Sequence, residues 1–154
     1  DNLIRDYIHW QYQLFMVKIG DEIIHLIMRQ NNIVLVGSVD KLGIPNISPR
    51  YVMTILDDEK IVFADAYVNK TFSNIKSWPK ITVAVVDSAK RTGFQLKGDA
   101  EEVTDQNVIN QATQKLKELG FPTSNTTVWA LNIKEIYSIT PSEKSKEPLI
   151  SAYG

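Results

Sequence analysis

The pattern of apolar residues changes from helical to extended near residue 33. Before this point, two short segments carry apolar residues at helical spacing; the first ends at Gly20, and Asp21 caps the second. After it, β-branched and apolar runs are separated by turn-forming residues, as expected of short strands. The strands predicted in this way cover residues 33–39, 46–56, 61–63, 81–87, 93–103 and about 127–139.

Two further helices are predicted between these strands. One opens near residue 70 and stops before Pro79, because proline disfavours helical geometry in the residue that precedes it. The other starts at Asp105 and closes at Gly120. Its predicted inward face consists of Val108, Ile109, Ala112, Leu116 and Leu119. Six strands joined mostly by hairpin-length turns, with helices at the chain entry and at two crossovers, predict a mainly β fold, a small antiparallel barrel.

Two of the strands carry finer signals. Gly98, inside the strand over residues 93–103, indicates a β-bulge or a close approach of another backbone. The strand over residues 46–56 alternates, so each set of every second residue should share one face. One face would carry Ile47, Tyr51, Met53 and Ile55, and the other Ser48, Arg50, Val52 and Thr54.

The stretch over residues 60–79, KIVFADAYVNKTFSNIKSWP, has an arrangement suited to binding an anion. A strand ends near Asp65, and after a short loop a helix opens with Asn69, Lys70 and Thr71. Backbone N–H groups at the start of a helix, a hydroxyl and an ammonium group would face one point. By spacing alone, the same residues also fit an ordinary exposed helix start.

Composition narrows the classes of function. With 154 residues, 44% of them hydrophobic and 23% charged, the chain is typical of one globular domain. A net charge of -1 gives no basic excess for a nucleic acid or a membrane surface. The absence of cysteine excludes disulfides, thiol catalysis and zinc–cysteine sites. No apolar run is long enough to cross a bilayer and no signal peptide is visible, so we expect a cytoplasmic protein.

The chain is expected to have two parts. Residues 1–20 would form an aromatic-rich helical arm or extension, and residues 21–154 would form the main domain. The two histidines, His9 and His25, lack metal-ligand spacing, and we predict no metal site.

Three motifs carry a resemblance to a known family. They are Ser-Pro-Arg at 48–50, the loop that runs from Phe-Ala-Asp at 63–65 to Asn-Lys-Thr at 69–71, and Lys-Gly-Asp-Ala-Glu at 97–101. In this order they resemble the FMN-binding split-barrel proteins related to pyridoxamine 5'-phosphate oxidase, over about residues 21–140. The resemblance implies a Greek-key split β-barrel, a tight homodimer, and FMN in a groove between the two protomers.

The resemblance also implies which residues of this chain bind the cofactor. Backbone groups of one strand would border the isoalloxazine ring, and the end of another strand would lie beside the ring and the ribityl chain. The residues implied for these contacts are Ser48, Pro49, Arg50, Tyr51, Val52, Ala64 and Asp65.

Lys70 and Thr71 match the pair that grips the phosphate in the family, which agrees with the anion site inferred from the helix start. Arg50 could also reach the phosphate, or it could instead be solvated or pair with Asp65. Trp129 of the partner chain is a candidate neighbour of the ring, although a tryptophan at such a position is more often a core or interface residue.

One departure from the family affects the expected activity. Pyridoxamine phosphate oxidase proper closes its substrate site with arginine and histidine near the C-terminus, and the tail EPLISAYG has neither. We therefore do not expect vitamin B6 chemistry. The leading hypothesis is a homodimeric FMN-dependent oxidoreductase, or a flavin reductase-like protein, with a reduced nicotinamide or a protein as electron donor. No catalytic acid or base is assigned, because the flavin itself performs the redox chemistry.

Three alternatives remain at this point. The first is an FMN carrier or electron-transfer protein without an organic substrate. The second is a family member that uses a deazaflavin or haem in place of FMN. The third is a barrel that has lost its cofactor and serves as an interaction protein, which the aromatic arm would favour.

Overall fold

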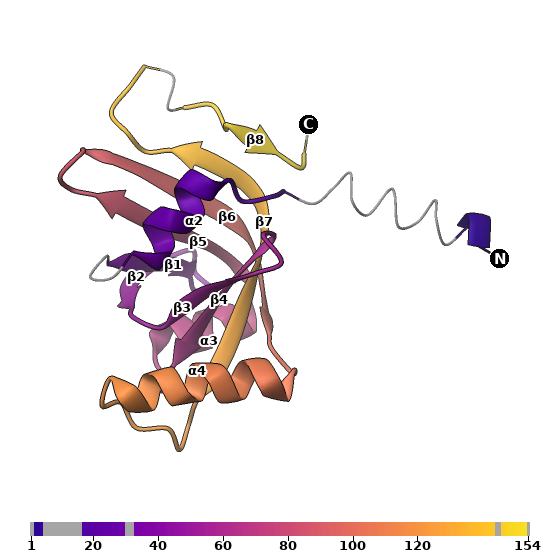
Figure 1. The fold of residues 1–154 in the computed structure, drawn as a ribbon, viewed down its shortest axis with the longest axis vertical. Helices are drawn as coiled ribbons and strands as arrows, with labels where there is room; N and C mark the ends of the chain where they lie inside the picture. Colours follow the sequence, from indigo (N-terminus) through magenta and orange to yellow (C-terminus); the bar gives the residue numbers. More distant parts are fainter. Residues whose placement is uncertain (1, 5–16, 30–32, 144–145, 154) are drawn as a thin grey trace.

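The computed structural model describes residues 2–4, 17–29, 33–143 and 146–153. It is mainly β, as predicted, with one curled antiparallel sheet that forms a half-barrel and a few helices around it (Figure 1). The elements are α2 (Asp21–Met28), β1 (Val34–Val39), β2 (Pro45–Arg50), β3 (Met53–Leu56), β4 (Lys60–Asp65), α3 (Lys70–Ser77), β5 (Lys80–Asp87), β6 (Thr92–Glu102), α4 (Gln106–Glu118), β7 (Thr127–Ser138) and β8 (Ile150–Ser151).

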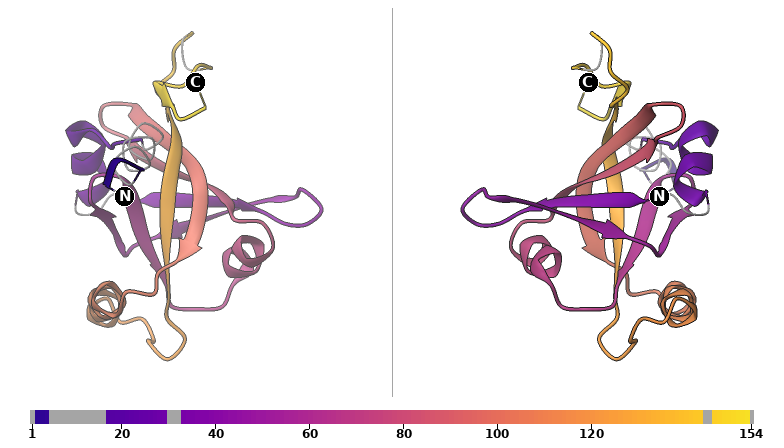
Figure 2. Two further views of the ribbon diagram at one scale, coloured as in Figure 1. Left: turned by 90° about the vertical axis from the view of Figure 1, so that its right-hand side faces the viewer. Right: turned by 90° about the vertical axis from the view of Figure 1, so that its left-hand side faces the viewer.

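The sheet follows the order β2-β1-β5-β6-β7-β4-β3, and the short β8 pairs with β7. The main core lies on the inner face of this sheet, where alternate residues of the central strands are fully buried. Helix α2 adds three buried residues to this core, and α4 covers a second, smaller cluster at the other end of the sheet (Figure 1). The β1–β2 hairpin extends away from the rest of the molecule (Figure 2).

The single strand predicted over residues 46–56 is wrong, because the structure divides it into β2 and β3. Strand β2 pairs with β1, whereas β3 pairs with β4, and Tyr51 and Val52 belong to neither ladder. Within β2 the side chains alternate between two faces, and the apolar Ile47 is on the open face: Ile47 is 65% exposed and Arg50 is buried. The polar side chains of β2 turn inward because α3 covers that face and offers them hydrogen-bond partners.

The predicted irregularity at Gly98 is confirmed. The pairing of β6 with β7 shifts register between Lys97 and Gly98. A Cβ atom at Gly98 would lie 1.9 Å from the backbone oxygen of Asn132, a distance that no side chain tolerates. Glycine is therefore required here because the neighbouring backbone approaches so closely.

Helix α4 agrees with the prediction at its start and differs at its end. The Asp105 side chain accepts a hydrogen bond from the Asn107 backbone N–H, which caps the helix. Leu119, which was predicted to face inward, is 56% exposed because the last turn rotates it away from the sheet. Gly120 follows with φ of +84°, the left-handed conformation that ends many helices.

The predicted N-terminal arm lies largely outside the described residues. This applies to His9 and to the aromatic residues Tyr7, Trp10, Tyr12 and Phe15. Val17 and Ile19, just before α2, are buried in the main core, and the Ile19 N–H donates to the Asp58 carbonyl at 2.6 Å. Near the end of the chain, the two residues of β8 pair with Glu135 and Ile136 of β7. In the described part of the chain, no helix has the length and hydrophobicity needed to span a membrane.

For α2, the prediction that Asp21 caps the helix is wrong by one position. The N-cap is Gly20, which has no capping side chain, and Asp21 is the first helical residue. Its carboxylate and that of Glu22 still lie in the first turn, where negative charge interacts favourably with the helix dipole.

Candidate cofactor-binding site

Six of the ten predicted site residues line one small cavity with a volume of about 110 Å³. They come from two strand ends that the fold brings together: the end of β2 with the residues that follow it, and the end of β4. These six are Pro49, Arg50, Tyr51, Val52, Ala64 and Asp65. The break between β2 and β3 therefore forms one side of the cavity.

A buried ion pair lies beside this cavity. Arg50 Nε donates to Asp65 Oδ1, and the second carboxylate oxygen of Asp65 accepts a hydrogen bond from Trp129 Nε1 at 3.3 Å. The side chains of Arg50 and Asp65 are 8% and 0% exposed, so water does not compete for their charges. The expected alternative, in which Arg50 pairs with Asp65, is thus the arrangement that the structure shows.

The environment changes the protonation equilibrium of Asp65. Burial raises the pKa of its carboxyl above the ordinary value of 3.8, and the Arg50 guanidinium and the Trp129 indole oppose part of that rise. A carboxylate held in this way keeps the guanidinium of Arg50 in one orientation.

One nitrogen of Arg50 remains available for a further interaction. Its Nη1 donates to Ser48 Oγ at 2.9 Å and to the Pro49 carbonyl at 2.7 Å. Its Nη2 is buried and has no hydrogen-bond partner among the described residues. A buried, charged donor without a partner is costly, and on a residue that lines a cavity it points to a ligand site nearby.

Thr71 belongs to the same hydrogen-bond network. Its side chain is 1% exposed, and its Oγ1 lies 3.0 Å from Ser48 Oγ and 3.3 Å from Asn46 Nδ2. The network thus runs from the first turn of α3 through Ser48 to Arg50. It ties the helix start to the inward face of β2.

Lys70 points elsewhere, although it is adjacent to Thr71 in the sequence. Its Nζ lies 3.6 Å from Asp40 at the tip of the β1–β2 hairpin, and its side chain is 59% exposed. The Asn69 side chain accepts a hydrogen bond from the Phe72 N–H at 3.0 Å, which satisfies one of the backbone donors at the start of α3. The predicted convergence of hydroxyl, ammonium and backbone donors on one point is not the arrangement in this structure.

Trp129 is enclosed by its own chain. It is 2% exposed, its ring meets Phe72 edge to face at 5.8 Å, and Lys76 Nζ lies 5.8 Å from its centroid. With its indole N–H on Asp65, Trp129 orients the carboxylate that holds Arg50.

Sequence reasoning missed most of the residues that complete the cavity. Leu116 and Phe121 come from the end of α4, and Ala66 and Tyr67 come from the link between β4 and α3. Asn69, which the sequence analysis named at the helix start, also lines the cavity. A signal for Phe121 was present, because an apolar residue directly after a helix-ending glycine commonly packs back on the last turn. Which strand that turn would cover could not be predicted from the local pattern.

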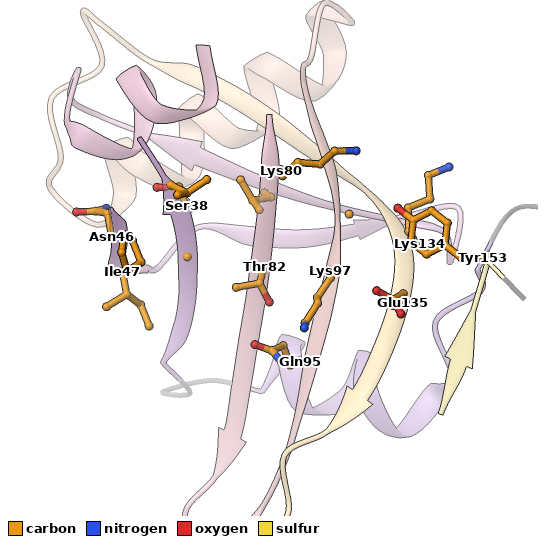
Figure 3. Close-up of a pocket in the computed structure, with 15 residues that line it drawn as sticks. Ser38, Asn46, Ile47, Lys80, Thr82, Gln95, Lys97, Lys134, Glu135 and Tyr153 are labelled. Carbon is orange, nitrogen blue, oxygen red and sulfur yellow. The ribbon is translucent and has the colours of Figure 1, made fainter. Parts of the chain in front are cut away.

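A larger and more open groove of about 700 Å³ lies on the outer face of the sheet, opposite the core. Strands β1, β2, β5, β6 and β7 form its floor, and Tyr153 after β8 lies at one end (Figure 3). Thr82 and Lys97 face each other across β5 and β6 in this floor. Ile47 of the hairpin borders it with an exposed side chain.

Residues 21–140 match the profile of the family described as pyridoxamine 5'-phosphate oxidase. The chain belongs to this family. The match includes all ten predicted site residues and every element from α2 to β7. The fold class expected from the resemblance is confirmed by it and by the related structures.

Two relatives are similar to this chain over most of its length. The uncharacterized protein MJ0282 of Methanocaldococcus jannaschii is 29% identical over 126 residues, which are 80% of this chain and 83% of that protein. The crystal structure of HupZ from Group A Streptococcus is 27% identical, has a TM-score of 0.69, and is matched over 80% of this chain and 96% of its own.

More distant structures share the fold alone. An FMN-binding protein from Syntrophomonas wolfei is 16% identical with a TM-score of 0.68, over 92% of this chain and 97% of its own. An F420 reductase is 13% identical with a TM-score of 0.61, over 77% of this chain and 98% of its own. A heme binding protein from Mycobacterium smegmatis is 16% identical with a TM-score of 0.64, over 86% of this chain and 57% of its own. Proteins with this fold thus hold different cofactors.

Proposed function

We propose that this protein binds FMN beside Arg50 and acts as a flavin-dependent oxidoreductase. The observation that carries the proposal is Arg50, which lines the cavity and whose buried Nη2 has no hydrogen-bond partner among the described residues. An ionised ligand group would satisfy it with a charge-assisted hydrogen bond. FMN supplies hydride and electron transfer when it is bound, and the protein supplies binding and orientation.

The residues fit distinct parts of the cofactor. Ser48, Pro49, Tyr51 and Val52 present the strand end and the break after it, where backbone groups can meet the polar edge of a flat ring. Ala64 leaves room beside the ring because the alanine side chain is small. Asp65 holds Arg50 through the buried ion pair and would not itself contact the phosphate, because like charges repel.

Lys70 and Thr71 are proposed for the phosphate together with Arg50. Lys70 is exposed enough to exchange its Asp40 partner for a ligand, and an exposed ion pair of this kind is worth little. Thr71 Oγ1 already lies in the network that reaches Arg50.

The phosphate assignment is tested by comparing FMN with riboflavin, which lacks the phosphate. Lys70→Ala should weaken FMN binding by about 1.5–3 kcal/mol, the worth of a hydrogen bond to a charged group, and leave riboflavin binding unchanged. Lys41→Ala, at the hairpin beside Lys70, is the matched control. An FMN affinity unaltered by Lys70→Ala would contradict the assignment.

We also propose a homodimer with the flavin at its interface. The cavity of about 110 Å³ is far smaller than the roughly 300–1,000 Å³ typical of sites that enclose a ligand of this size. Most of a bound flavin would therefore stay uncovered unless a second chain lies over it. The hairpin exposes Leu42, Ile44 and Ile47 next to the open groove, and such apolar surface favours association.

The dimer is tested by light scattering of the wild type and of Ile47→Glu. The wild type should have twice the mass of the chain, and the variant should be a monomer, because a charge would be buried at the interface. Lys41→Glu at the hairpin tip serves as the control. A wild-type monomer at micromolar concentration would refute the homodimer.

A different cofactor is the second candidate, and the fold shared with an F420 reductase and a heme binding protein favours it. Titration of the purified protein with FMN, F420 and haem, followed by visible absorption, separates these cases. FMN should remain with the protein through gel filtration. If it binds FMN but oxidises no reduced nicotinamide with any acceptor, the protein is an electron carrier. If it binds F420 or haem instead, the FMN proposal is wrong.

A further inference from the structure

The end of α4 forms one wall of the cavity that contains Arg50. Leu116 and Phe121 line it, although they lie more than 50 residues after Asp65 in the sequence. The two residues of the buried ion pair, Arg50 and Asp65, line it as well. The cavity is therefore lined both by a charged pair and by apolar and aromatic side chains.

The chain holds Phe121 firmly in this position. The Gly120 N–H donates to the Lys117 carbonyl at 3.0 Å, and the Phe121 N–H donates to the Leu116 carbonyl at 3.0 Å. With the positive φ of Gly120, these two bonds form a Schellman motif, in which the residue after the glycine packs back on the helix. Phe121 accordingly packs against the buried cluster that includes Leu116.

Tyr51 also lines the cavity and adds a second ring to its aromatic wall. Its ring stacks on that of Phe121, with centroids 6.3 Å apart and an angle of 21° between the planes. Tyr51 lies in the break between β2 and β3 and is 60% exposed, so solvent or a ligand can reach its ring. Two stacked aromatic rings from distant parts of the chain thus line the cavity together with Arg50.

We propose that Phe121, together with Tyr51, is the surface on which the planar ring of the bound cofactor rests. The inference rests on the proposed function, which supplies the flat ligand, and adds a contact from α4. Aromatic side chains attract flat heteroaromatic rings by stacking. With the phosphate near Arg50 and Lys70, the ring contacts the aromatic residues and the phosphate contacts the charged ones. Phe121 then favours ligands that have a flat ring, whether or not they carry a phosphate.

This division of roles predicts different results for two flavins. Phe121→Ala should raise the Kd of FMN and of riboflavin by the same factor, about tenfold, because both have the ring. Lys70→Ala should raise the Kd of FMN alone. Leu119→Ala is the matched control, since Leu119 belongs to the same turn but does not line the cavity, and it should change neither Kd.

A second variant separates ring contact from folding. Phe121→Leu keeps an apolar side chain on Leu116, so its thermal unfolding midpoint should stay near that of the wild type, yet it cannot stack. The inference predicts that this variant still loses about tenfold in affinity for both flavins. The bound flavin is detected by fluorescence and visible absorption, which need no turnover.

The outcomes separate the two proposals. If the wild type binds both flavins and Phe121→Leu binds them equally well, the ring contact is wrong while the proposed function stands. If Phe121→Leu weakens FMN but not riboflavin, Phe121 acts on the phosphate side and the inference is also wrong. If the wild type binds neither flavin, the proposed function fails and this inference fails with it.

Discussion

The cavity beside Arg50 and the groove on the outer face of the sheet differ in how their polar groups are held. In the cavity, the ion pair of Arg50 and Asp65 is buried and connected to Ser48, Thr71 and Trp129. In the groove, Lys97 lies above the Tyr137 ring at 4.4 Å, and the floor is broad and open. The cavity is organised within one chain, whereas the groove offers shape and apolar surface that a second molecule could cover.

Each region contains a buried polar atom without a partner among the described residues: Arg50 Nη2 in the cavity and Thr82 Oγ1 in the groove. A charged nitrogen and a neutral hydroxyl differ greatly in the cost of burial. The first therefore indicates a ligand, and the second is a small loss of stability. The predictions below test this difference.

The largest effect is expected for Arg50→Ala. Removing one partner of a buried ion pair leaves Asp65 with an uncompensated charge, and the free energy of unfolding should fall by about 3–5 kcal/mol. Urea unfolding measures it, with Lys97→Ala in the groove as a control that should change stability by less than about 0.5 kcal/mol.

The double variant Arg50→Met, Asp65→Leu tests the reason for this effect. It removes both charges, so it should recover much of the stability lost by Arg50→Ala. A double variant no more stable than the single one would show that packing, rather than the unpaired charge, causes the loss.

The next effect concerns two glycines in the floor of the groove. Gly98→Ala should cost about 3 kcal/mol, the upper end for overpacking, because the new Cβ meets the backbone of Asn132 at 1.9 Å. Gly37→Ala should cost less than about 1 kcal/mol, since its new Cβ meets the Thr82 methyl at 2.8 Å and that side chain can rotate. Equal losses in urea unfolding would mean that the floor around β6 and β7 yields as easily as that around β1.

The pH dependence of stability should differ between Asp65 in the cavity and Asp40 in the β1–β2 hairpin. Burial raises the pKa of Asp65, so above pH 3.8 the folded protein holds a proton that the unfolded chain has released. Stability contributed by Asp65 therefore falls as pH rises from 3.8 through its raised pKa. The backbone N–H of Ile44 in the hairpin lowers the pKa of Asp40, which contributes stability that is lost as pH falls below 3.8.

Urea midpoints between pH 2 and 7 test both signs. Asp65→Asn should flatten the decline above pH 3.8, and Asp40→Asn should flatten the loss on the acid side. If Asp65→Asn keeps the wild-type slope above pH 3.8, the buried carboxyl titrates like an ordinary one.

The smallest effect is expected for Thr82→Val. The valine has the shape of threonine and removes a hydroxyl without a partner among the described residues, so stability should rise or stay within about 0.5 kcal/mol of the wild type. Thr71→Val has the same shape change in the cavity network and should cost about 1 kcal/mol or more, because Ser48 and Asn46 each lose a hydrogen bond to Thr71 Oγ1. Equal changes in stability for the two variants would mean that the polar groups of the cavity and of the groove do not differ in how they are held.

Much of the fold could be predicted from local pattern. Gly98 indicated the bulge, because glycine weakens a strand and is usually found inside one only at a bulge or where another backbone comes close. Gly120 indicated the end of α4. The division of residues 46–56 into β2 and β3 could not be predicted, because every residue there tolerates extended backbone. The break depends on which neighbour each half pairs with.

The candidate site shows the same limit. The helix start at Asn69 was predicted correctly, but Lys70 and Thr71 point to different partners because successive helical residues are rotated by about 100°. The Arg50–Asp65 pair was one of three alternatives that the sequence left open, beside a solvated Arg50 and a contact with the phosphate. Phe121 could not be placed beside Tyr51, since 70 residues separate them along the chain.

The sequence by itself determined the mainly β architecture, most element positions and the family motifs, because these depend on residue periodicity and on turn-forming residues close together in the chain. The tertiary structure decided which face of β2 is buried, which partner Arg50 takes, and that the end of α4 closes the cavity. These depend on contacts between distant segments, and the free energy of burying a charge or a ring is set only when those segments meet.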